Sequence, residues 1–437
     1  MRQTSGGSAG FAAVRALARL LLAVFYRRID VVGAARVPAQ GGLIVAANHH
    51  NSIVDAMLLL VSVPRPLRPL AKAQLFEHFL IGPFLRMVGA LPVHRRQEAG
   101  DDPHKNDALF EATTRTLRAG GGIFIFPEGR TQPEPVLLEL RTGAARMLLA
   151  ARPAEATLLP AGLVFRRPGI FREGEALVLF GEPVATQGKD AREITESLAA
   201  ALRALIVEAE DLETLGLLEA AESVWSAAGG TSHAPEARVR WLQLAAERYR
   251  GLAREQPERL ADFVRRLQAL VREVEESGFS LHSLAVPRVK PVMRFALRQA
   301  FALFVAAPLA LCGFLLHGVP YALVALVLRV PHSGEEDATI KMAAGLVLYP
   351  LCWALEGWLA WRYGGAPALA ALLVLLVPSG FVALSWRERL ARLEKGIRGL
   401  ARLLRDPRLA ERLRAQRDAL ALELRQLAAQ GVGGQGR

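Results

Sequence analysis

Residues 41–60, GGLIVAANHHNSIVDAMLLL, contain the pattern that decides the fold of the first half of the chain. The short apolar run after two glycines is typical of a buried strand. The apolar residues from Ala56 onward begin a helix, so the polar segment between them is a strand-to-helix turn. Residues five apart on a regular helix are rotated by about 140°. A contact between His50 and Asp55 therefore requires the histidine to lie in the turn and the aspartate in the first turns of the helix.

Such a contact between His50 and Asp55 predicts a general base. A carboxylate beside an imidazole fixes the tautomer of the ring and stabilises the imidazolium that forms when the ring takes a proton. A hydroxyl made nucleophilic in this way attacks a thioester directly, without a covalent enzyme intermediate. A second interpretation needs no chemistry, because Ser52 and Asp55 also form a pattern like a capping box, with Asp in place of Glu or Gln.

A second polar turn follows another predicted strand, in residues 120–131, GGGIFIFPEGRT. The strand covers residues 123–126, and the turn after it carries the Glu128 carboxylate, Gly129 and the Arg130 guanidinium. Glycine allows close approach to the backbone and arginine binds anions, so the turn suits a bound anion. The alternative is an ordinary turn with a surface ion pair.

Together the two turns resemble blocks one and two of the glycerolipid acyltransferases, a family that includes glycerol-3-phosphate and 1-acylglycerol-3-phosphate acyltransferases. Three further segments fit the pattern of that family, at residues 71–76, 89–95 and 158–163. The resemblance covers roughly residues 35–185 and is specific as a constellation, although each segment is weak alone. The sequence departs from the family in three places. Asn48 precedes a doubled histidine, Asn51-Ser52 differs from the x-Ser spacing of the lysophosphatidate branch, and Arg130-Thr131 replaces the more common Thr-Arg order.

The resemblance implies a role for each motif residue. By it, His50 is the general base, Asp55 orients the base, and the acceptor phosphate is bound by Glu128, Gly129, Arg130 and Thr131. Basic residues near the motifs are candidates for contacts with the phosphate or with the diphosphate of the acyl donor, although a solvated surface charge is an equal alternative for each; these are Lys72, Arg95, Arg96 and Arg141.

The expected activity is that of a membrane-bound O-acyltransferase of phospholipid biosynthesis. It transfers a fatty acyl group from acyl-CoA or acyl carrier protein, as co-substrate, to a hydroxyl of glycerol 3-phosphate or 1-acylglycerol 3-phosphate, and no cofactor is expected. The alternatives are a lysophospholipid-remodelling acyltransferase and a non-catalytic membrane scaffold or lipid carrier with the same fold. A metal-dependent hydrolase that uses His49 and His50 lacks a convincing ligand set, so no metal is expected.

Composition indicates which partners the chain binds. The 54 basic and 42 acidic residues give a net charge of +12, which suits anionic lipid or nucleic acid. The sequence contains no recognised nucleic-acid motif, so a membrane surface is the favoured partner and no nucleic acid is expected. Cys312 and Cys352 lie far apart in apolar runs and are expected to pack as small hydrophobic residues.

The distribution of apolar residues predicts five parts. Residues 1–32 form an interfacial amphipathic helix or, with equal weight, a core helix of the catalytic domain. Residues 33–188 form the acyltransferase domain, an α/β fold with a largely parallel mixed sheet. A soluble helical module (189–290), an α-helical membrane domain (291–386) and a basic helical tail (387–437) follow. The tail is expected to lie on anionic lipid or to form a coiled coil.

Within the membrane domain, residues 342–361 and 366–386 each have roughly the 20 apolar residues that a bilayer requires. Basic residues flank the whole domain on both sides, so the positive-inside rule places the catalytic domain and the tail on the cytoplasmic face and requires an even number of crossings. Residues 300–328 are therefore expected to form a re-entrant hairpin bent at residues 318–320. Glu356, an acid within a predicted span, is a functional candidate or faces a helix interface.

Overall fold

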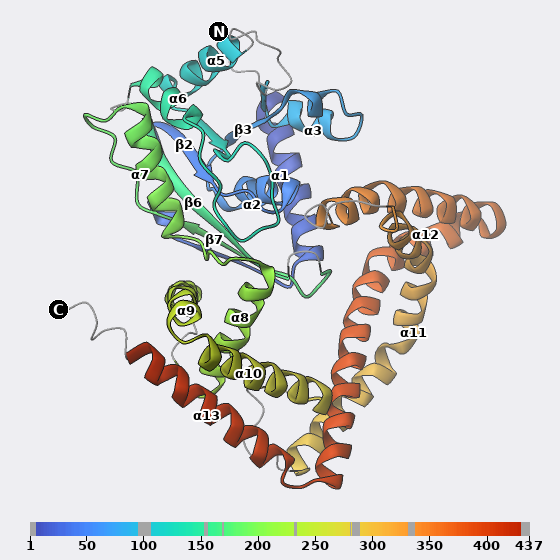
Figure 1. Ribbon diagram of the computed structural model, residues 1–437. Coiled ribbons are helices and arrows are strands. Elements are labelled where there is room, and N and C mark those ends of the chain that lie inside the picture. The colour runs from blue at the N-terminus through green and yellow to red at the C-terminus, as the bar shows by residue number, and fades with distance from the viewer. Residues whose placement is uncertain are drawn as a thin grey trace. The chain divides into compact units, whose positions relative to one another are not determined.

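The computed structural model describes residues 6–94, 106–152, 156–167, 170–230, 234–279, 281, 289–330 and 337–429. The chain forms two compact units. The first consists of residues 1–212 with two short later segments, 234–239 and 332–339, and the second contains the rest of the chain. Figure 1 shows the strands in the first half of the chain, and the later elements among the described residues are helices.

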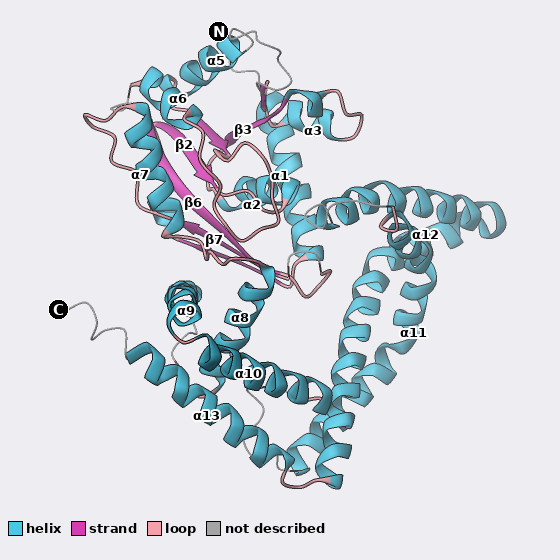
Figure 2. Cartoon of the chain, viewed as in Figure 1, coloured by secondary structure: helices cyan, strands magenta, loops and turns pink. Residues whose placement is uncertain are grey.

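The first unit is built on a seven-stranded sheet in the order β1-β7-β6-β2-β5-β3-β4 (Figure 2). All neighbouring strands are parallel except β6 and β7. This confirms the predicted α/β fold with a largely parallel mixed sheet. The strands are β1 (Arg28–Val32), β2 (Gly42–Ala47), β3 (Leu67–Lys72), β4 (Leu91–Val93), β5 (Gly122–Ile125), β6 (Ala156–Arg166) and β7 (Glu175–Phe180).

Helices cover the sheet because its central strands are apolar on both faces, as parallel strands in α/β folds are. Helices α5 (Asp107–Arg118), α6 (Gly143–Ala151) and α7 (Ala191–Arg203) share one core with Ile44, Ile123 and Leu158 of the central strands. Helices α1 (Gly6–Phe25), α2 (Ser52–Ser62) and α3 (Ile81–Met87) lie on the other side (Figure 1). Two 3₁₀ turns complete the unit, η1 (Ala34–Arg36) and η2 (Ala73–Phe76).

Helix α1 belongs to the first unit. Its Leu22 and Phe25 are buried, and it packs against α2 and α3. The Arg15 guanidinium donates hydrogen bonds to the carbonyls of Val61 and Val63 at the end of α2, at 3.1 and 2.7 Å. Of the two predictions for this segment, these contacts favour a core helix of the catalytic unit.

The second unit contains a helical module made of segments far apart in sequence. Helices α8 (Leu212–Ala227), α10 (Pro257–Ser277) and α13 (Leu409–Ala429) share one apolar core, which includes Val224, Leu267 and Leu413. Helix α9 (Pro235–Glu255) lies between α8 and α10 in sequence. The basic tail therefore contributes one apolar face to this module. Within α13, Leu409, Leu413 and Leu420 are buried in the core shared with α10, whereas Leu422 is exposed.

Two long apolar helices follow, α11 (Val289–Val327) and α12 (Asp337–Arg405), each long and apolar enough to cross a membrane. The predicted re-entrant hairpin is wrong, because α11 continues through Gly318 and Pro320. The break lies instead in α12 at Gly365, whose φ of 64° and ψ of −160° are not helical. A proline inside an apolar helix can bend the helix without ending it, and α11 contains both Pro308 and Pro320.

Helix α11 and the second half of α12 are antiparallel. The Trp386 indole donates a hydrogen bond to the Leu303 carbonyl at 2.9 Å, and the His317 imidazole contacts the Leu376 carbonyl at 2.9 Å. At the basic end of the pair, Arg389 donates to the Gln299 side chain at 3.3 Å. The two basic flanks of the predicted membrane domain thus lie at the same end of the helix pair.

Candidate active site

Two polar turns meet at one edge of the sheet. His49 and His50 follow the carboxyl end of β2, and Glu128 follows the carboxyl end of β5, its parallel neighbour. In open α/β sheets, ligands bind outside the carboxyl ends of the strands. The sheet therefore brings together two motifs that are about eighty residues apart in sequence, as predicted.

Asn48 fixes the start of the first turn. Its side chain is fully buried and pairs with the backbone of Leu163 on β6, donating from Nδ2 to the carbonyl oxygen at 2.9 Å and accepting from the backbone N–H at 2.7 Å. The amide thus imitates one more residue of backbone pairing beyond the end of β2, so the chain enters the turn in a fixed direction.

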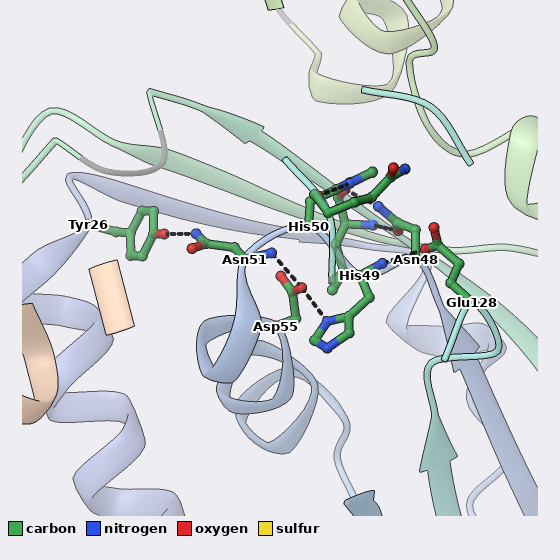
Figure 3. A network of polar contacts seen from close by, with 9 residues as sticks. Tyr26, Asn48, His49, His50, Asn51, Asp55 and Glu128 are labelled. Atoms are coloured by element: carbon green, nitrogen blue, oxygen red, sulfur yellow. Dashed lines mark hydrogen bonds and ion pairs between the residues drawn. The ribbon is translucent and has the colours of Figure 1, made fainter. Parts of the chain in front are cut away.

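The histidine that contacts Asp55 is His49. Its Nδ1 lies 2.8 Å from Asp55 Oδ2, whereas Nδ1 of His50 lies 3.1 Å from the Gln132 carbonyl oxygen (Figure 3). The predicted contact between His50 and Asp55 is therefore corrected. The sequence argument assumed a simple helix start, but Ser52 adopts a left-handed φ of 47°, which turns the chain so that the histidine six residues before the aspartate faces it.

The His49 ring is held so that one nitrogen stays available. The ring stacks on Phe126, with 4.0 Å between centroids and 8° between planes. A carboxylate accepts hydrogen bonds only, so Nδ1 carries the proton and Nε2 presents a lone pair. Nε2 has no hydrogen-bond partner among the described residues, and the side chain is 17% exposed. This is the arrangement of a general base.

Asp55 is fully buried at the start of α2. Its Oδ2 accepts two hydrogen bonds, from His49 Nδ1 and from the Asn51 backbone N–H, both 2.8 Å long. Its Oδ1 has no hydrogen-bond partner in the described part of the chain. A buried carboxylate with a free oxygen is costly to stability, and such costs are characteristic of functional sites.

Glu128 joins the two turns, because each of its carboxylate oxygens accepts one backbone hydrogen bond. Its Oε1 accepts the His49 backbone N–H at 2.7 Å, and its Oε2 accepts the Leu138 N–H at 3.1 Å. Burial raises the pKa of Glu128, while the two backbone hydrogen bonds and the neighbouring histidines oppose that rise. These bonds show that Glu128 positions the backbone of His49, while its place in the acceptor-phosphate site stays a prediction.

The other predicted site residues lie around the second turn. Gly129 has a left-handed φ of 71°, and a Cβ built there would lie 2.7 Å from Arg141 Nε, so only glycine allows Arg141 to lie against the turn. Arg130 and Arg141 are exposed, and Thr131 is partly exposed. Lys72 ends β3 at the same edge of the sheet. Arg95 and Arg96 lie outside the described residues.

Sequence reasoning missed three residues of the site. Phe126 carries the ring that stacks on His49, Asn51 supplies a backbone N–H to Asp55, and the Tyr26 hydroxyl accepts a hydrogen bond from Asn51 Nδ2 at 2.8 Å. An aromatic residue directly after a strand was the available signal for Phe126. For Tyr26 no signal existed, because its contact with residue 51 is created by packing of α1 on α2.

Comparison with known proteins relates the first unit to acyltransferases. Residues 28–164 match the family model described as Acyltransferase. The chain is 28% identical over 188 residues to a 1-acyl-sn-glycerol-3-phosphate acyltransferase of Bacillus subtilis, covering 42% of this chain and 88% of the relative. It is 27% identical over 135 residues to glycerol-3-phosphate O-acyltransferase 2 of Saccharomyces cerevisiae, covering 28% of this chain and 18% of that protein.

A crystal structure of the 1-acyl-sn-glycerophosphate acyltransferase PlsC from Thermotoga maritima is 18% identical, with a TM-score of 0.35, over 44% of this chain and 77% of the other. The match to the family model contains every described residue of the two polar turns. Residues 28–164, in the first unit, form an acyltransferase domain, so the chain is an acyltransferase enzyme.

Proposed function

We propose that the protein is a membrane-bound glycerolipid O-acyltransferase in which His49 is the general base. It transfers a fatty acyl group from acyl-CoA or acyl carrier protein to a hydroxyl of glycerol 3-phosphate or 1-acylglycerol 3-phosphate. The observation that carries the proposal is the contact between His49 Nδ1 and the buried carboxylate of Asp55, which leaves Nε2 at the carboxyl edge of the sheet.

The reaction follows from this geometry. Nε2 of His49 takes the proton of the acceptor hydroxyl as its oxygen attacks the carbonyl carbon of the thioester. Asp55 stabilises the imidazolium that forms. The carbon–sulfur bond then breaks, the thiolate leaves with the electron pair, and the imidazolium returns the proton to the sulfur. The products are an ester and a free thiol, so no covalent enzyme intermediate is required.

The acceptor phosphate is bound by the exposed guanidinium groups beside the second turn. Arg130 follows Gly129 directly, and Arg141 lies against Gly129. The absence of a side chain at Gly129 supports this role, because a phosphate can approach the backbone of the turn while both cations reach it. Lys72, at the end of β3, is a further candidate cation. The long apolar substrates explain why the same chain carries two helices apolar enough for a bilayer.

Membrane attachment is proposed through α11 and the second half of α12. Apolar side chains along both are exposed, among them Phe304, Leu315 and Val374. Exposed apolar residues at this density suit lipid rather than water. Because the two basic flanks lie at one end of the helix pair, the positive-inside rule places both in the cytoplasm together with the catalytic unit.

The decisive experiment compares the two adjacent histidines in the full chain, purified in detergent. Labelled oleoyl-CoA is supplied with glycerol 3-phosphate or, separately, with 1-oleoylglycerol 3-phosphate, and the labelled lipid is measured. We expect His49→Ala to abolish transfer and His50→Ala to retain most of it, because only His49 contacts Asp55. If only His50→Ala loses acyl-transfer activity, His50 rather than His49 is the general base. Full activity of both variants would reject base catalysis at this turn.

A further inference from the structure

The turn that carries the proposed base is strained, and a contact with helix α1 holds it. Ser52 has a φ of 47°, in the left-handed region that residues with a side chain rarely adopt. Such conformations persist only where surrounding contacts fix them, and they gather at functional sites. The residue before Ser52 is Asn51, whose side chain and backbone N–H are both engaged in described contacts.

Asn51 has an unusual use at the start of α2. A residue at this N-cap position ordinarily bonds its side chain to the first backbone N–H groups of the helix, but the Asn51 side chain makes no such bond. Instead its Nδ2 donates to the Tyr26 hydroxyl at 2.8 Å, while its backbone N–H donates to Asp55 Oδ2 at 2.8 Å (Figure 3). The Asn51 side chain therefore does not cap α2 and instead contacts Tyr26, which lies outside the helix.

Tyr26 is a firm anchor for this contact. It follows the last residue of α1, is 2% exposed, and packs against the rings of Phe25 and Phe165 at centroid distances of 5.3 and 6.2 Å. Burial and the negative charge of Asp55 raise the pKa of Tyr26, so its hydroxyl stays protonated at neutral pH. Its hydroxyl oxygen is thus a neutral acceptor fixed between α1 and the sheet.

We infer that Tyr26 and Asn51 are positioning residues for the base, linked in the order Tyr26, Asn51, Asp55 and His49. Neither touches the reacting atoms. The Tyr26 hydroxyl holds the Asn51 side chain, which fixes the Asn51 backbone N–H on the same oxygen of Asp55 that accepts from the imidazole. Loss of the first contact relaxes the strained turn and loosens the imidazole at the other end. This inference rests on the proposed function, because it assigns both residues a role in aligning the proposed base.

The test uses Tyr26→Phe, which removes one oxygen and keeps the ring. We expect kcat to fall about tenfold, the effect of one lost hydrogen bond on the alignment of the base, with KM for oleoyl-CoA and for the acceptor unchanged within twofold. The downfield proton signal of the hydrogen-bonded imidazole Nδ1–H, observed with ¹⁵N-labelled histidine, should shift or broaden. The double variant with Asn51→Ala should lose no more activity than Asn51→Ala alone, because the two residues act through one contact.

A matched control separates positioning from stability. Phe25→Leu removes packing next to Tyr26 without touching a hydrogen bond, so it should lower the unfolding temperature while kcat stays at the wild-type value. Wild-type kcat in Tyr26→Phe, an unchanged imidazole signal, or additive losses in the double variant would each overturn the inference. Those outcomes leave the proposed function intact if His49→Ala is inactive. An inactive wild type, or an active His49→Ala, would instead defeat the proposed function itself.

Discussion

Replacing Asp55 by asparagine separates the effect of the buried negative charge on stability from its effect on activity. The amide has nearly the same shape, and its oxygen can still accept from the Asn51 backbone N–H and from the His49 ring. What the substitution removes is the negative charge. In the wild type that charge is fully buried, and its Oδ1 has no hydrogen-bond partner among the described residues. Asp55→Asn is therefore expected not to lower the unfolding temperature while strongly lowering activity.

The size of the loss follows from the geometry of the ion pair in the transition state. His49 Nδ1 and Asp55 Oδ2 are 2.8 Å apart, so the centres of the imidazolium and carboxylate charges lie roughly 4 Å apart. At an effective dielectric constant of about 20, that attraction is worth about 4 kcal/mol. A barrier raised by about 4 kcal/mol slows the chemical step about 10³-fold, close to the loss of about 10⁴ typical of the same change in a catalytic triad.

The assay is incorporation of labelled oleoyl groups from oleoyl-CoA into glycerolipid by the purified full chain, at saturating acceptor, with thermal unfolding followed in parallel. Asp30→Asn is the matched control. Asp30 lies on β1, pairs with Arg28 at 2.7 Å and is partly exposed, so its replacement should leave kcat unchanged. An Asp55→Asn enzyme that retains more than a tenth of wild-type kcat would refute the ion-pair reasoning.

Three further predictions concern the second turn and the long helices. Burial raises the pKa of Glu128, so the folded chain binds the proton of this carboxyl more tightly than the unfolded chain does. The wild type should therefore lose stability relative to Glu128→Gln as the pH rises through that raised pKa. Thermal unfolding from acid to neutral pH measures this difference. Gly129→Ala should displace the Arg141 side chain and raise KM for the phosphorylated acceptor roughly tenfold with little change in KM for the acyl donor; equal effects on both substrates would contradict a phosphate role. In a variant without the two native cysteines, Arg298→Cys and Arg389→Cys should react with an impermeant maleimide from the same side of sealed vesicles, and labelling from opposite sides would exclude the antiparallel pair as two crossings.

The membrane domain shows where reasoning from sequence stops. The positive-inside rule requires both basic flanks to lie on the same side of the membrane. The predicted bend at residues 318–320 met that requirement by returning residues 300–328 to the side from which they entered. The structure satisfies the same condition differently, with a continuous α11, a break at Gly365 and an antiparallel second half of α12. A proline in an apolar segment bends or ends a helix according to which neighbours satisfy the freed carbonyl, and those neighbours are not visible in sequence.

The helical module shows the same limit. The leucine spacing of residues 409–429 correctly indicates a helix with an apolar face, but the partner of that face is α10, more than a hundred residues earlier. Amphipathic periodicity indicates that one face of a helix is buried, but it does not identify the element against which that face packs. The structure pairs one face of this segment with α10, and contact of the tail with anionic lipid stays a prediction.

The sequence alone determined the order of strands and helices that makes a parallel α/β sheet, and the two polar turns that such a sheet must bring to one edge. Periodicity and strand direction are local properties, and parallel neighbours align their carboxyl ends wherever the rest of the chain goes. The choice of His49 rather than His50 as the partner of Asp55 arises from long-range packing. That choice depends on the left-handed backbone of Ser52, in a turn that is held by Tyr26 after α1, Asp55 of α2 and Glu128 after β5.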